Sequence, residues 1–194
     1  MQRLYYLRTG LLCTALAAAV LLASCDSGSS NEQTKETALR LSEASAESWD
    51  ARQDAAFLIE AYSYGLMIVR YSELALEKAQ SPTAKSFAEQ SATWHKKLNN
   101  EIEQMALHKE VALPDAEGAN VQRYLEKLNK FSSPRFEQEY LLVLSDIQSN
   151  MMHQYEIASD EAMDMNMRNW ASQTLPYMQA HAQAVNELQD QLGD

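Results

Sequence analysis

Four long stretches of this chain repeat apolar side chains at steps of three and four residues. That spacing places the apolar side chains on one face of an α-helix. A helix with one apolar face must bury that face against other elements, so the sequence predicts four amphipathic helices packed together. The four series are Leu58, Tyr62, Leu66, Val69 and Leu76, with Glu73 as the one polar member; Phe87, Trp94, Leu98, Ile102 and Met105; Phe136, Tyr140, Leu144, Ile147, Met151 and Tyr155; and Ala171, Leu175, Met178, Val185, Leu188 and Leu192.

The connections between these stretches set the topology. Ser81-Pro82 and Ser133-Pro134 each place a capping serine before a proline at the first helical position, which is typical of a helix start. A longer connection, with a short helical piece over 121–128, separates the second helix from the third. The sequence therefore predicts an all-α, up-down four-helix bundle over residues 50–192, of the ferritin-like type with one longer crossover between helices 2 and 3.

Composition agrees with this fold class. The chain has only five Gly and four Pro among 194 residues, which is typical of an all-α protein. Residues 25–48 are rich in Ser and Glu and contain few large apolar side chains that a core could bury. We therefore expect residues 25–48 to be a flexible tether in front of the bundle.

The N-terminus has the three parts of a signal peptide. Arg3 and Arg8 supply positive charge, and the apolar run 11–23 is shorter than the ~20 residues that a membrane-spanning helix needs. Leu22-Ala23-Ser24-Cys25 then resembles the lipobox of bacterial lipoproteins. An ordinary secretory signal with a chance cysteine is the less favoured alternative, because the cysteine falls where the apolar run ends.

The lipobox resemblance implies cleavage after residue 24 and attachment of lipid, such as palmitate, to Cys25. Two or three acyl chains anchor a protein stably, whereas one chain binds only marginally. The sequence thus predicts a lipoprotein of the cell envelope that partners the membrane through its N-terminal lipid. The outer membrane, facing the periplasm, is the favoured location; Asp26 resembles the inner-membrane retention signal of enteric bacteria and leaves the inner membrane open.

Cysteine and charge then exclude several classes of function. Cys13 would be removed with the signal peptide, and lipid would occupy Cys25, so the mature chain has no thiol for catalysis, disulfides, zinc fingers or iron–sulfur clusters. Cleavage leaves 14 basic and 27 acidic side chains, a net charge of −13. Such an acidic chain is a poor partner for nucleic acid and for a flat anionic membrane surface.

A set of short motifs runs through the stretch from Asp54 to Leu188: Phe57 with Ala61, Gly65-Leu66-Met67, Lys78-Ala79-Gln80-Ser81-Pro82, Phe87-Ala88, His95, Phe136 with Tyr140, Thr174-Leu175-Pro176 and His181. On these motifs and their spacing, the stretch resembles the family catalogued as domain of unknown function 4142. That family is often labelled as outer-membrane proteins and is grouped with ferritin-like folds, and it has no settled activity.

The resemblance also implies where a polar cluster would lie inside the bundle. The family pattern has a Glu on the first helix and one His on each of the others. The corresponding positions here hold Ile68, His95, Gln148 and His181. Two of the four candidate ligands are therefore replaced.

His95 and His181 each flank the apolar face of their helix and could face each other. One interpretation is a two-histidine metal or proton site. The favoured alternative is two histidines hydrogen-bonded to backbone or to neighbours such as Tyr62, because two nitrogen ligands rarely complete a metal shell. No histidine is preceded by Glu at the third position before it, so ferritin-like di-iron chemistry is not expected.

Met163, Met165 and Met167 are the second candidate for a metal site. Thioethers suit Cu(I), and copper handling is an envelope function. The alternative is that these methionines fill irregular gaps in the core.

The sequence contains no nucleophile elbow, P-loop or glycine-rich dinucleotide turn. We therefore expect a non-enzymatic structural or interaction module without a cofactor, with an envelope protein as a possible partner. The alternative is an envelope metal-binding protein, with copper at the Met163–Met167 segment or a weak site at His95 and His181.

Overall fold

A computed structural model describes residues 30–46, 48–115 and 119–193 of the chain. The residues that it describes form six α-helices and no β-strand, which confirms the all-α class. The helices are α1 (Ser30–Ser45), α2 (Trp49–Lys78), α3 (Pro82–His108), α4 (Ala119–Asn129), α5 (Arg135–Glu161) and α6 (Met165–Gly193).

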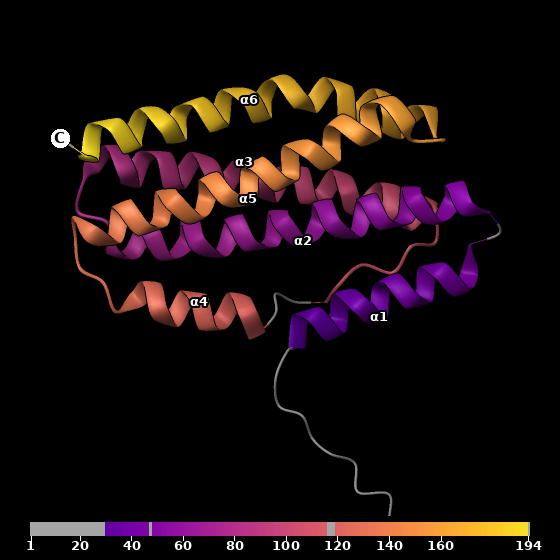
Figure 1. Ribbon diagram of the computed structural model, residues 1–194, viewed down its shortest axis with the longest axis horizontal. Helices are drawn as coiled ribbons and strands as arrows, with labels where there is room; N and C mark the ends of the chain where they lie inside the picture. Colours follow the sequence, from indigo (N-terminus) through magenta and orange to yellow (C-terminus); the bar gives the residue numbers. More distant parts are fainter. Residues whose placement is uncertain (1–29, 47, 116–118, 194) are drawn as a thin grey trace, which may run out of the picture.

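The four long helices α2, α3, α5 and α6 lie side by side (Figure 1). Helix α2 packs mainly on α3 and helix α5 mainly on α6, and contacts of α2 with α5 and of α3 with α6 join the two pairs. Each pair is antiparallel, and α5 starts at the same end of the molecule as α3 (Figure 1). The chain returns to that end through α4, which packs on the outside against α1, α2 and α5.

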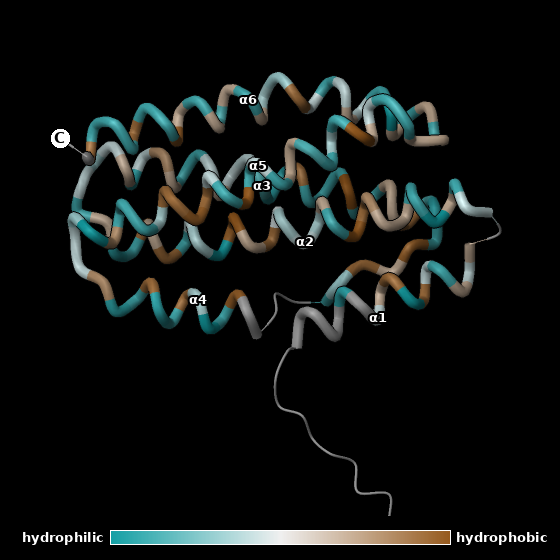
Figure 2. Tube along the Cα trace, in the orientation of Figure 1, coloured by the Kyte–Doolittle hydropathy of each residue, from teal (hydrophilic) through white to brown (hydrophobic). Residues whose placement is uncertain are grey.

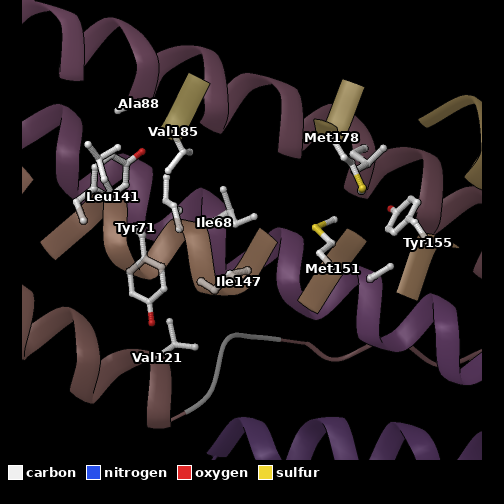
Figure 3. Close-up of a cluster of buried hydrophobic side chains, with 14 of the residues drawn as sticks. Ile68, Tyr71, Ala88, Val121, Leu141, Ile147, Met151, Tyr155, Met178 and Val185 are labelled. Atoms are coloured by element: carbon white, nitrogen blue, oxygen red, sulfur yellow. The ribbon is translucent and has the colours of Figure 1, made fainter. Parts of the chain in front are cut away.

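Apolar and polar residues alternate along each long helix (Figure 2), so one face of each helix can enter a shared core. Figure 3 shows part of that core, where Ile68, Met151 and Tyr155 lie between the helices. The predicted apolar faces of the later helices are largely buried, including Leu98, Ile102, Leu144, Met178 and Val185.

The buried face of α2 agrees with the predicted one only in part, because Leu58 and Val69 are buried as predicted. Tyr62, Leu66 and Leu76 are only half-buried. The face turned to the other helices instead carries Ala61, Gly65, Ile68, Ser72 and Ala75, all buried. Small side chains on this face allow a close approach of α3, and a search for large apolar residues does not find them.

The structure confirms one of the two predicted serine caps and contradicts the other. Ser81 does cap α3: its Oγ accepts a hydrogen bond of 3.3 Å from the backbone N–H of Ala84, and Pro82 is the first helical residue. Ser133 is not the cap of α5, because that helix begins after Pro134 and has no side-chain cap. Glu137, in the first turn of α5, instead ties the start of that helix to the turn between α2 and α3.

The prediction of a flexible tether over 25–48 is corrected for residues 30–45, which form α1. Helix α1 packs against α2 and α4 (Figure 1). Ala38 and Ser42, one turn apart, are buried, and Lys35 forms an ion pair of 2.5 Å with Glu60 of α2. The buried side chains Ala38 and Ser42 are small, and Ser42 is polar, so they give no sign of a buried face in the sequence.

The segments 1–24 and 25–29, which include Cys25, lie outside the described residues. Within the described part of the chain, no helix has an apolar stretch long enough to cross a bilayer.

Candidate functional site

Three polar side chains from three different helices meet in the middle of the bundle: His95 of α3, Gln148 of α5 and His181 of α6. The ring centroids of the two histidines are 5.4 Å apart, with the rings nearly perpendicular at 86°. The side-chain amide of Gln148 contacts Nδ1 of His181. The structure thus brings together the two histidines that the sequence placed beside the apolar faces, with Gln148 at the third position that the family resemblance implies.

Aromatic side chains surround this histidine cluster. The indole of Trp94 stacks on His181 at 5.6 Å between centroids and meets His95 edge-on at 4.6 Å. The ring of Phe87 lies 4.9 Å from His181. Trp94 also lines a groove of about 340 Å³ between α3 and α6, together with Tyr177. The indole of Trp94 therefore contacts both the cluster and the surface groove.

Most polar atoms of the cluster are buried without a hydrogen-bond partner among the described residues. These atoms are both ring nitrogens of His95, Nε2 of His181 and Oε1 of Gln148. Tyr62, a partner suggested by the sequence, instead donates its hydroxyl to Glu103 at 2.8 Å. Each buried polar atom without a partner lowers the stability of the fold by about 1–3 kcal/mol. The cluster is therefore chemically suited to a small ligand that would pair with several of these atoms.

Both imidazoles are neutral near pH 7. Burial lowers the pKa of His95 well below its ordinary value, and the neighbouring His181 lowers it further. Burial also lowers the pKa of His181, to about 4. A neutral imidazole has a nitrogen lone pair available, and this is the form that binds metal ions.

The donor set of the cluster is small. Within the described residues, no group of three or more His, Cys, Asp or Glu side chains is arranged to hold a metal ion. The α2 position that would complete the family pattern is Ile68, which is fully buried. The cluster therefore offers two imidazole nitrogens and one amide oxygen, fewer ligands than a closed zinc site has.

The three candidate methionines lie in different environments. Met167 is 1% exposed and belongs to the core, whereas Met163 and Met165 are 59% and 61% exposed. A thioether copper site needs its sulfur atoms to converge on one point, and this difference in burial does not favour a three-methionine copper site, which stays a prediction.

Met163 lies in the turn between α5 and α6, whereas Met165 and Met167 belong to the start of α6. Asp54 of α2 holds that turn. The carboxylate of Asp54 accepts hydrogen bonds of 3.1 Å from the backbone N–H groups of Met163 and Asp164. Lys109, just after α3, pairs with Asp54 at 3.4 Å and with Asp164 at 2.8 Å. Sequence reasoning missed this buried carboxylate, because the contact joins positions more than 100 residues apart.

A second carboxylate of this kind lies at the other end of the bundle. Glu137, in the first turn of α5, accepts hydrogen bonds from the backbone N–H groups of Gln80 and Ser81, at 2.8 and 3.1 Å. It therefore ties α5 to the turn between α2 and α3. Burial acts to raise the pKa of Glu137, but these N–H donors hold it below its ordinary value.

Comparison with known proteins places the chain in a family. Neither the curated proteins nor the solved structures gave a match. The family described as "Domain of unknown function (DUF4142)" matches residues 38–188, a range that starts within α1 and ends near the end of α6. Because this match covers most of the chain, the protein belongs to the DUF4142 family.

Proposed function

We propose that this chain is a lipid-anchored protein of the cell envelope, with lipid on Cys25, and that its helical domain is a non-enzymatic structural or interaction module. The sequence Leu22-Ala23-Ser24-Cys25 at the end of an apolar run supports the anchor. The outer membrane, facing the periplasm, is the proposed location.

We also propose that the four long helices have a ferritin-like topology. Two antiparallel pairs, α2 with α3 and α5 with α6, support it, as does the single long crossover that contains α4. One long connection among short ones distinguishes this topology from a simple up-down bundle.

The observation that carries the proposal is the position of α1 relative to Cys25. Only residues 26–29 separate that cysteine from the first residue of α1. The five Cα–Cα steps from Cys25 to Ser30 span at most about 18 Å. Because α1 packs on α2 and α4, a lipid at Cys25 would hold the bundle close to the membrane, with the α1 side nearest to it. A module held in this way meets partners at or near the membrane surface.

Metabolic labelling with an alkyne analogue of palmitate tests the anchor. We expect label on the wild-type chain and on Cys13→Ser, a matched control at the other cysteine, and none on Cys25→Ser. Label that persists on Cys25→Ser, or a wild-type chain that takes up none, would overturn the proposal.

A second candidate function is an envelope metal-binding protein with its site at His95 and His181. The unpaired, neutral ring nitrogens described above favour it. Cu(I) is the proposed ion, because it accepts imidazole ligands and tolerates low coordination numbers.

An anaerobic Cu(I) titration, followed by desalting and metal analysis, tests this second candidate. We expect about one copper per chain, lost in His95→Ala and in His181→Ala. The control His153→Ala changes an exposed histidine of α5 and should leave the copper content unchanged. A chain that retains no copper, or one whose copper survives both substitutions, would refute this candidate.

A further inference from the structure

A second groove, of about 390 Å³, lies between the N-terminal part of α2 and the C-terminal part of α5. Its apolar lining includes Trp49, Phe57, Ile157 and Met163. Trp49, Ile157 and Met163 are 67%, 39% and 59% exposed, so large apolar side chains remain uncovered at this groove. Exposed Trp and Met side chains of this kind are enriched in the centres of protein interfaces.

The rim of the groove is acidic. Asp50, Glu60 and Glu161 line it, with the buried Asp54 beneath them, and no Lys or Arg among the described residues belongs to the lining. Asp54 and Glu60 are already paired with Lys109 and Lys35. Asp50 and Glu161 have no ion-pair partner in the part of the chain that the structure describes. Two carboxylates beside an apolar floor are therefore free to meet positive charge from outside.

The negative charge of the chain also indicates which kind of molecule can bind in this groove. A second copy would bring the same acidic rim and, without residues 1–24, a net charge of −13 to the groove, and anionic lipid would likewise be repelled. A cationic occupant is attracted by both the rim and the whole domain.

The shape of the groove fits a helix. Its α2 side runs from Trp49 to Glu60, about 17 Å at the rise of an α-helix, which corresponds to three turns of a partner helix. Two helices with an apolar cleft between them are a common dock for a third amphipathic helix.

We propose that this groove binds an amphipathic helical segment of another protein, whose apolar face is flanked by Lys or Arg. The inference rests on the interaction role in the proposed function and names the chemistry of the partner. The apolar residues of the segment would pack on Trp49, Ile157 and Met163, and its cations would meet Asp50 and Glu161.

Binding of designed peptides to the full chain in nanodiscs of zwitterionic lipid tests the inference, with empty nanodiscs subtracted. One peptide of about 12 residues has Leu on one helical face and Lys on the other. A second has the same composition in scrambled order, and a third has Glu in place of Lys. We expect the amphipathic Lys peptide to bind, the scrambled peptide to bind at least roughly tenfold more weakly, and the Glu peptide not to bind.

Matched variants locate the binding. Trp49→Ala should weaken binding of the Lys peptide roughly tenfold, whereas Leu142→Ala, which removes another exposed apolar side chain of α5, should not. Glu161→Gln should weaken binding and reduce its salt dependence, whereas Glu89→Gln on α3 should not.

Three outcomes would overturn the inference: equal binding of the scrambled peptide, binding unaffected by Trp49→Ala, or self-association of the chain that Trp49→Ala abolishes. The last outcome would assign the groove to a second copy. Palmitate labelling is independent of these measurements, so loss of peptide binding with labelling intact refutes the groove and leaves the anchor standing.

Discussion

Gly65 of α2 lies directly against the side chain of Asn99 of α3. A Cβ atom added at Gly65 would overlap the amide group of Asn99. Both residues are buried, on the faces where α2 and α3 pack. The absence of a side chain at Gly65 therefore sets how closely these two helices approach.

Gly65→Ala should destabilise the protein by about 1–3 kcal/mol, because it overpacks this contact. Without the clash, Gly65→Ala should stabilise the helix by about 1 kcal/mol, because Ala is the better helix former. A loss of stability therefore indicates the clash with Asn99, and a gain indicates that there is none. Urea unfolding measures the change in stability. In the double variant with Asn99→Ala, the clash partner is gone, and the added cost of Gly65→Ala should disappear. A single Gly65→Ala variant that is more stable than wild type would disprove this account of the contact.

Asp54→Ala should lower the free energy of unfolding by at least about 2 kcal/mol. It leaves two backbone N–H groups of the α5–α6 turn without their acceptor, and hydrogen bonds to a charged group contribute about 1.5–3 kcal/mol each. Asp160→Ala, at an exposed carboxylate of α5, is the matched control and should stay within about 0.5 kcal/mol of wild type. Equal effects of the two substitutions would show that Asp54 does not hold the turn.

Glu137 should give the protein a stability component that depends on pH. Its pKa in the folded chain lies below the ordinary value of 4.5, so the unfolded chain binds the proton more tightly. The stabilisation is therefore complete above pH 4.5 and is lost as the pH falls through the lower, folded pKa. The stability difference between wild type and Glu137→Gln should shrink as the pH falls from about 6 to about 3. Glu89→Gln, at an exposed position, should show no such trend, and a difference that grows on acidification would contradict the assignment.

Tyr140→Phe should cost about 1–2 kcal/mol. The hydroxyl of Tyr140 lies 2.9 Å from Oγ of Ser72, which donates at 3.2 Å to Oγ of Ser91, so the substitution breaks a buried network that joins α5 to α2 and α3. Thermal or urea unfolding measures the loss. Tyr177→Phe removes an exposed hydroxyl and should have almost no effect. If Tyr140→Phe leaves the free energy of unfolding unchanged, the hydrogen bond between Ser72 and Ser91 is sufficient without the hydroxyl of Tyr140.

Sequence reasoning predicted the features that depend on local chemistry. The four long helices follow from apolar periodicity, and the start of α3 follows from Ser81 followed by proline. His95 and His181 could be placed beside the core from their neighbours three and four positions away, and they do meet.

What the sequence could not supply depends on partners distant in the chain. The buried residues of helix α1 include Ala38 and Ser42, one small and one polar, which do not mark a buried face in the sequence. The family resemblance marks the position of Gln148, but only the folded chain shows that its side-chain amide contacts His181. The anchoring of the α5–α6 turn by Asp54 is likewise a property of the folded chain alone.

The central claim, a lipid anchor on Cys25, is tested most directly by mass spectrometry of the N-terminal peptide of the chain purified from membranes of its native host. We expect a peptide that begins at Cys25 and carries the mass of a diacylglyceryl group, with or without a further acyl group on its amine. An N-terminal peptide in which Cys25 is unmodified, or one that still contains residues 1–24, would contradict the account.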